Sequence, residues 1–264
     1  NKQALEDRYG ELQDINGDDK ISIVLYDIVD EYIRGSNDTN SSLFTHGYFT
    51  VYPEQDLDSD EIVTVNEGEM LFLDAFPQVI ESDDSDFSTM FNAIVHEYTK
   101  LLITQNESAE EAWLKEGLAF YEQKRILEDV KFFGGGTGPG TTAANQLTYI
   151  SFSKKNRTDQ HNVYLFLNYL FEKFSGVTGW EIINELAGTE FQGINAVNEA
   201  LISMGHSDYN AREVFIDYAT ACFLDIEQSL LAYNEKYNMD NVDLYGAPSG
   251  KNAASLTFDS TRPP

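Results

Sequence analysis

The sequence has little cysteine, little histidine and few basic residues. Cys222 is the single cysteine, so no disulfide framework can form within the chain. Seventeen lysines and arginines stand against 45 aspartates and glutamates, which gives a formal net charge of -28. Because clusters of lysine and arginine bind phosphate groups, this composition argues against a nucleic-acid partner. No apolar run approaches the length needed to cross a bilayer, so no membrane span is predicted.

The rest of the composition is typical of a folded protein. Hydrophobic residues make up 42% of the 264 positions and aromatic residues 13%, which is enough to form the core of one large domain or of two lobes. The acidic excess predicts a well-solvated, repulsive surface, and cation binding or a saline habitat are alternative explanations. The chain starts at Asn1 rather than at a methionine, and we expect a secreted or cell-envelope protein whose leader is absent from this sequence.

Three apolar segments predict strands in the first third of the chain. After a helical or irregular segment at 1–13, residues 21–28 are mostly apolar and β-branched, which predicts a central strand. Residues 46–53 and 69–74 predict two further strands. We therefore expect residues 1–85 to form a β-rich N-terminal lobe.

The loop before the first strand resembles a calcium site in one respect. The segment DINGDDK, which starts at Asp14, places side-chain oxygens at alternating positions. An EF-hand needs glycine at its sixth place and glutamate at its twelfth, where this chain has Asp19 and Leu25. The pattern favours an Asn-Gly turn that leads into the strand, and a calcium-stabilised surface protein remains the weaker alternative.

A helix is predicted from about Phe87 to Thr104. Its apolar residues recur at helical spacing, namely Phe91, Ile94, Val95, Tyr98, Leu101 and Leu102. The helix carries the segment HEYTK, in which His96 and Glu97 are followed by Lys100. This segment differs by one residue from HExxH, in which two histidines on one helix face hold zinc and the glutamate activates water.

A second helix follows and carries the segment WLKEG with Glu116. The two segments together resemble the gluzincin metallopeptidases. Over about residues 10–205 the chain is also similar to the hyicolysin-like bacterial branch, because its segments follow the same order: ISIVLYDI, GYF, EGEMLFLDAFP, HEYTK, WLKEGLA and VYLFLNYLFEKFSG. The resemblance implies a zinc-dependent endopeptidase scaffold. It assigns His96 as the first zinc ligand, Glu97 as the general base and Glu116 as the third ligand. Lys100 stands where the second histidine ligand is expected.

The lysine changes the chemistry of such a site. A protonated lysine has three donors and no lone pair, so it cannot bind a metal ion in that form. At about 4 Å and an effective dielectric constant near 20, its repulsion from a divalent zinc ion is roughly 8 kcal/mol. Lys100 can instead neutralise Glu97 and Glu116, which favours a site that is metal-free or binds metal weakly. An active enzyme with a substitute ligand is the alternative, and the other histidines are His46, His161 and His206.

The second half of the chain is predominantly helical by pattern. The helix predicted at 159–174 begins near His161 and Tyr164, and the resemblance makes either one a candidate for stabilising the oxyanion. A helix-cap histidine and a packed aromatic ring are the alternative roles. The glycine-rich segment 133–140 predicts a flap or connector.

Three more packing helices are predicted at residues 178–187, 194–205 and 211–227. His206 follows Gly205, which predicts a helix C-cap rather than a ligand.

The predicted fold is α+β and zincin-like. We expect a β-rich N-terminal lobe at 1–85, a helical lobe at 86–236, a cleft between them, and an extended tail at 237–264. The predicted function is that of a hyicolysin-type metallopeptidase homologue with a degenerate site and a peptide- or protein-binding role; the alternative is an active exported zinc endopeptidase. Zinc is expected only if the site is functional, and otherwise no cofactor. The substrate and the oligomeric state are left open.

Overall fold

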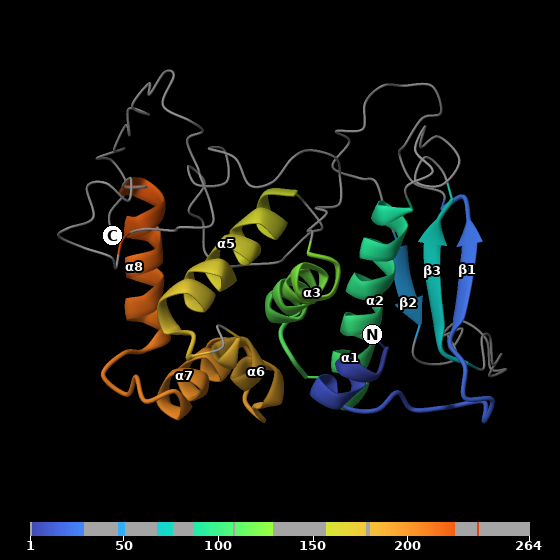
Figure 1. Cartoon of the computed structure of the whole chain (residues 1–264), viewed down its shortest axis with the longest axis horizontal. Helices are drawn as coiled ribbons and strands as arrows, with labels where there is room; N and C mark the ends of the chain where they lie inside the picture. Colours follow the sequence, from blue (N-terminus) through green and yellow to red (C-terminus); the bar gives the residue numbers. More distant parts are fainter. Residues whose placement is uncertain are drawn as a thin grey trace, which may run out of the picture.

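A computed structural model of the chain describes residues 2–28, 47–50, 68–75, 87–107, 109–128, 157–177, 180–224 and 237. The molecule is rich in helices, with a small sheet at one end (Figure 1). The predicted α+β class is confirmed, while the zincin-like arrangement and the cleft remain predictions. His46, the glycine-rich segment 133–140 and all of the predicted tail except Tyr237 lie outside the described residues.

The described sheet has three strands in the order β1-β3-β2. The strands are β1 (Ser22–Tyr26), β2 (Gly47–Thr50) and β3 (Met70–Asp74). β3 pairs parallel with β1 and antiparallel with β2. The prediction of a central strand at 21–28 is therefore wrong within this sheet, where β1 lies at the edge and Leu25 is 49% exposed. Apolar, β-branched composition indicates a strand, but pairing with distant segments decides its place in the sheet.

Helix α2 (Ser88–Asn106) packs against one face of the sheet. Alternate residues of a strand share a face, and Leu71 and Leu73 of β3 are fully buried in this way. The apolar side chains Leu101 and Leu102 of α2 are also fully buried and belong to the same core. The helical apolar period therefore buries these positions of α2, and the polar residues of the site described below lie on the same buried helix.

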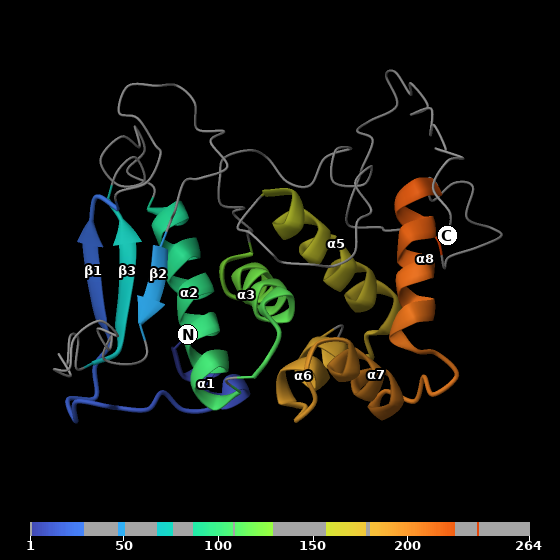
Figure 2. The ribbon, with the colours of Figure 1, turned by 180° about the vertical axis from the view of Figure 1, so that it is seen from behind.

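Helix α3 (Ala112–Leu127) packs against α2, and α5 (Arg157–Phe174) packs against α3 (Figures 1 and 2). The α3–α5 contact depends on Gly117, because a Cβ atom there would lie 2.5 Å from Leu167 Cδ1 and 2.8 Å from Val163 Cγ1. The glycine of the WLKEG segment thus lets two helices approach closely.

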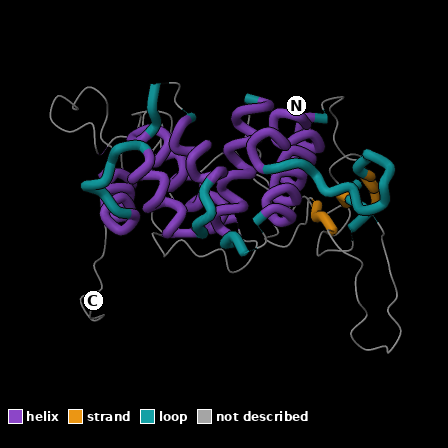
Figure 3. Tube along the Cα trace, turned by 90° about the horizontal axis from the view of Figure 1, so that it is seen from below, coloured by secondary structure: helices purple, strands orange, loops and turns teal. Residues whose placement is uncertain are grey.

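Three further described helices lie away from the sheet (Figure 1), and Figure 3 shows the strands gathered at one end of the helical part. These helices are α6 (Glu181–Gly188), α7 (Gly193–Ser203) and α8 (Ala211–Leu224), close to the predicted ranges. After α7, Gly205 has a φ of +83° and the backbone N–H of His206 donates to Leu201 O. This geometry is the C-terminal cap that the Gly205-His206 pair predicted.

Helix α1 (Lys2–Tyr9) belongs by sequence to the predicted N-terminal lobe, yet it packs against α2 and α6. Leu5 and Tyr9 are buried there, and Tyr98 of α2 donates to Glu6 at 2.9 Å. The described strands and α1 therefore make separate contacts with the helical part, and the domain boundaries stay a prediction. None of the described helices combines the length and apolar character that crossing a bilayer requires.

Candidate functional site

Helices α2 and α3 bring four of the predicted residues together. His96, Glu97 and Lys100 lie on α2, and Glu116 lies on α3. Residues three and four apart share a helix face, so Lys100 is a neighbour of both His96 and Glu97 on the side that meets α3. The pairing of the two helices adds the carboxylate of Glu116 to this group.

Glu116 lies between the histidine and the lysine. Its Oε1 is 3.1 Å from Nε2 of His96, and its Oε2 is 3.1 Å from Nζ of Lys100. The Lys100 ammonium also lies 3.3 Å from Oε1 of Glu97. Lys100 therefore donates to two carboxylates that come from different helices.

The group is buried. His96 is 0% exposed, Glu97 5% and Glu116 4%, and the side chain of Lys100 is 16% exposed. The ring of Phe120 lies 4.7 Å from that of His96, between ring centroids. Because little water reaches these charges, their mutual interactions are screened less than those of a surface pair.

The pKa values of the two charged partners move in opposite directions. Burial alone would raise the pKa of Glu116, but Lys100 and then His96 outweigh it and lower that pKa to about 2. Burial opposes the charge of Lys100 as well, yet the carboxylates of Glu116 and Glu97 raise its pKa above the ordinary 10.5. At neutral pH the lysine is thus an ammonium ion held by two carboxylates, with no lone pair to offer.

This arrangement does not fit a zinc centre. A catalytic zinc site uses three protein ligands with lone pairs and leaves a fourth position for water. Here the position at which the resemblance expects the second histidine ligand carries the ammonium of Lys100, 3.1 Å from Oε2 of Glu116. Within the described segments, no three side chains of His, Cys, Asp or Glu form a group that could hold a metal ion.

The loop that resembled a calcium site forms a turn. The carboxylate of Asp14 accepts hydrogen bonds from the backbone N–H groups of Gly17, Asp18 and Asp19, at 2.8 to 3.1 Å. Asn16 Oδ1 accepts from the N–H of Asp18 at 3.0 Å. The side-chain oxygens of Asp14 and Asn16 thus accept hydrogen bonds that form a local turn. Calcium binding stays an untested alternative.

The two predicted oxyanion residues lie on α5. His161 is in the helix, but its side chain lies outside the described part. Tyr164 is buried, with its ring 5.6 Å from that of Tyr121 and 6.4 Å from that of Phe120. Burial, followed by the charge of Glu172, raises the pKa of Tyr164 to about 12. Its packing is clear in the structure, and a role in a reaction remains a prediction.

Two neighbours of the site were not predicted. Gly47 of β2 lies beside Glu97, since a Cβ atom on Gly47 would be 3.5 Å from Cγ of Glu97. Phe120 lies four residues after Glu116 on α3, and that spacing could have indicated contact with the same partner helix. No local pattern links Gly47 to Glu97, because β2 and α2 are joined by a long stretch of chain.

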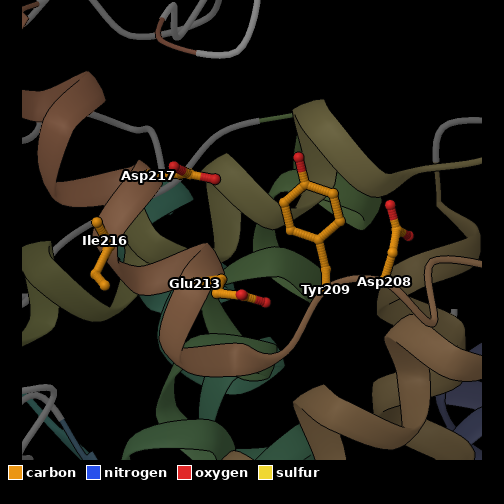
Figure 4. Close-up of a pocket in the computed structure, with 5 residues that line it drawn as sticks. All are labelled: Asp208, Tyr209, Glu213, Ile216 and Asp217. Carbon is orange, nitrogen blue, oxygen red and sulfur yellow. The ribbon is translucent and has the colours of Figure 1, made fainter.

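A pocket of about 330 Å³ lies at the other end of the helical part (Figure 4). It is lined by Asp208, Tyr209, Glu213, Ile216 and Asp217. These residues belong to α8 and to the segment before it, whereas α2 lies at the opposite end, next to the sheet (Figure 1). The pocket includes none of the predicted site residues.

The chain is similar to a neutral metalloprotease, ShpI, of Staphylococcus hyicus. The two sequences are 26% identical over 183 residues, which cover 64% of this chain and 38% of the metalloprotease. The chain thus spans less than two fifths of the length of that relative. No family model matches the chain. The distant similarity indicates a metallopeptidase-like protein.

Proposed function

We propose that this chain is a hyicolysin-type zincin homologue that binds peptide or protein segments and has lost most or all metal-dependent hydrolysis. The observation that carries the proposal is the position of Lys100, 3.1 Å from Glu116 and 3.3 Å from Glu97. In the resemblance these carboxylates are a zinc ligand and the general base. Both are engaged here by an ammonium group, which supports a site without the ion that would activate water.

The edge of the sheet supports polypeptide binding. Strand β2 is at the edge of the described sheet and contacts α2, with Gly47 close to Glu97. An extended peptide can add to such an edge through main-chain hydrogen bonds, while pockets for alternate side chains provide selectivity. A peptide that joined β2 in this way would run beside the α2 residues of the site. Secretion or attachment to the cell envelope is part of the same proposal.

The proposal is tested by measuring binding and hydrolysis separately. Fluorescently labelled, unfolded casein peptides are titrated with the chain, and fluorescence anisotropy reports binding. The same mixtures, with and without added zinc, are assayed for new amino termini. We expect saturable binding without cleavage, and equal binding by the Glu97→Gln variant. The control ligand is a folded protein whose net charge is similar to that of the casein peptides, and it should bind more weakly than those extended peptides.

Other outcomes have clear meanings. Cleavage that is lost with Glu97→Gln and with a chelator would support the alternative of an active zinc endopeptidase with a substitute ligand. Absence of binding to any unfolded peptide would overturn the polypeptide-binding role.

A further inference from the structure

The carboxylates of Glu97 and Glu116 pose a physical problem for the α2–α3 pair. The two residues belong to different helices and are at most 5% exposed. A buried carboxylate without a compensating charge is strongly unfavourable. The close packing of α2 on α3 therefore depends on a positive charge between these two groups.

We propose that the ammonium of Lys100 is a resident structural cation that takes over the charge compensation a metal ion would provide between α2 and α3. The inference does not depend on polypeptide binding, because it concerns only how the helix pair is held together. Lys100 is in this sense a positioning residue. It holds Glu97 through a contact within α2 and Glu116 through a contact with α3.

The geometry favours a cation with this role over an ordinary surface lysine. The side chain of Lys100 is 16% exposed, and its nitrogen has two carboxylate partners within 3.3 Å. Lys115 of α3 provides a comparison, since it also reaches across to α2 but donates to the neutral hydroxyl of Thr104 at 3.4 Å. An ammonium is attracted more strongly by two carboxylates than by one neutral hydroxyl, so the two lysines should differ in their effects.

The experiment compares Lys100→Met with Lys115→Met by thermal unfolding of the full chain. Each substitution keeps an unbranched side chain and removes the charge. Loss of the charge at position 100 removes the ammonium partner of both buried carboxylates and leaves Glu116 with its contact to His96, and we expect a melting temperature lowered by roughly 10 °C. Lys115→Met should lower it by only about 2 °C. Equal effects of the two substitutions would overturn the proposal.

A triple variant separates lost charge compensation from lost packing. Glu97→Gln, Lys100→Met and Glu116→Gln together remove the lysine and both negative charges. We expect this protein to recover most of the melting temperature lost in Lys100→Met, and to fold even if the single variant does not. If the triple variant is no more stable than Lys100→Met alone, Lys100 acts through packing and the proposal fails.

A further experiment tests whether a metal ion can replace the lysine between Glu97 and Glu116. In the Lys100→His variant, zinc should raise the melting temperature, because the introduced imidazole would join His96 and Glu116 to provide three ligands with lone pairs. The wild type and the double variant Lys100→His, Glu116→Gln should show no such rise. Zinc-dependent stabilisation of the wild type would overturn the inference while leaving polypeptide binding untouched, and failure of peptide binding would leave this inference standing.

Discussion

Arg8 of α1 and Glu122 of α3 form an ion pair of 2.7 Å between residues separated by 114 positions in the sequence. The side chain of Glu122 is fully buried, and the same oxygen accepts a hydrogen bond from the hydroxyl of Tyr9 at 3.1 Å. Nε of Arg8 donates to Asn184 of α6 at 3.1 Å. One arginine thus ties the first helix to two helices from later in the chain.

The substitution Arg8→Ala should destabilise the protein by about 3 kcal/mol, because it leaves the buried carboxylate of Glu122 without its charged partner. Burial already raises the pKa of Glu122, against the effect of Arg8. The free energy of unfolding is measured by urea denaturation at pH 7. Adding Glu122→Gln to Arg8→Ala should recover part of the loss, because the unpaired charge is then removed.

The control for this prediction is Lys2→Ala on the same helix. The Lys2 side chain is 53% exposed and pairs with Glu6 at 3.3 Å. Exposed pairs of this kind contribute about 0.5 kcal/mol, so the change should be small. Equal losses for Arg8→Ala and Lys2→Ala would mean that the Arg8–Glu122 pair does not anchor α1.

Gly117 provides a second prediction, at the contact between α3 and α5. Substitution by alanine would bring a Cβ atom to 2.5 Å from Leu167 and 2.8 Å from Val163. Both side chains are buried, so the helices must separate slightly, at a cost of about 1–3 kcal/mol. Chemical denaturation checks this value, and the same experiment on Gly188→Ala is the matched control.

Gly188 ends α6, and outside its own turn of the helix no atom lies within 4 Å of the position a Cβ atom would take. Alanine at such a site reduces the entropy of the unfolded chain and should stabilise the protein by about 0.4–1 kcal/mol. The two glycine substitutions are thus expected to have opposite signs. Stabilisation by Gly117→Ala would show that the α3–α5 contact has room for a methyl group.

The helices of the candidate site could be predicted because their patterns are local. The apolar period over α2 and the segments HEYTK and WLKEG place His96, Lys100 and Glu116 on helices. The three-residue and four-residue spacings then predict which α2 side chains are neighbours. The charge of Lys100 could also be predicted to matter for Glu97 and Glu116, since opposite charges in one site attract.

The contacts between distant segments could not be predicted in this way. Nothing near Arg8 indicates that its partner is Glu122, and nothing in β2 indicates that Gly47 lies beside Glu97. The apolar, β-branched segment of β1 predicted a strand but gave no information on its partners. Such contacts depend on the packing of whole elements, and the periodicity of a single segment does not contain them.

The carboxyl group of Glu110, just before α3, should make the free energy of unfolding depend on pH. Its Oε1 accepts hydrogen bonds from the backbone N–H groups of Glu111, at 2.6 Å, and of Gly193, at 2.8 Å. Burial is the main cause that raises the pKa of Glu110 above its ordinary 4.5, and the two backbone donors oppose that rise. Because the folded-state pKa is the higher one, folding favours the protonated carboxyl, and this contribution is lost as the pH rises through the folded-state pKa.

The substitution Glu110→Gln isolates this effect. Glutamine keeps an oxygen that can accept both backbone bonds, but it does not titrate. Below the ordinary pKa of 4.5 the two proteins should therefore differ by a constant amount. As the pH rises from there towards neutrality, the wild type should lose stability relative to the glutamine variant, and the difference should level off above the raised pKa. Urea unfolding of both proteins at each pH measures this difference, in which the effects of the other carboxylates largely cancel. If the wild type instead gains stability relative to Glu110→Gln as the pH rises, the backbone donors outweigh burial and the assigned direction of the pKa shift is wrong.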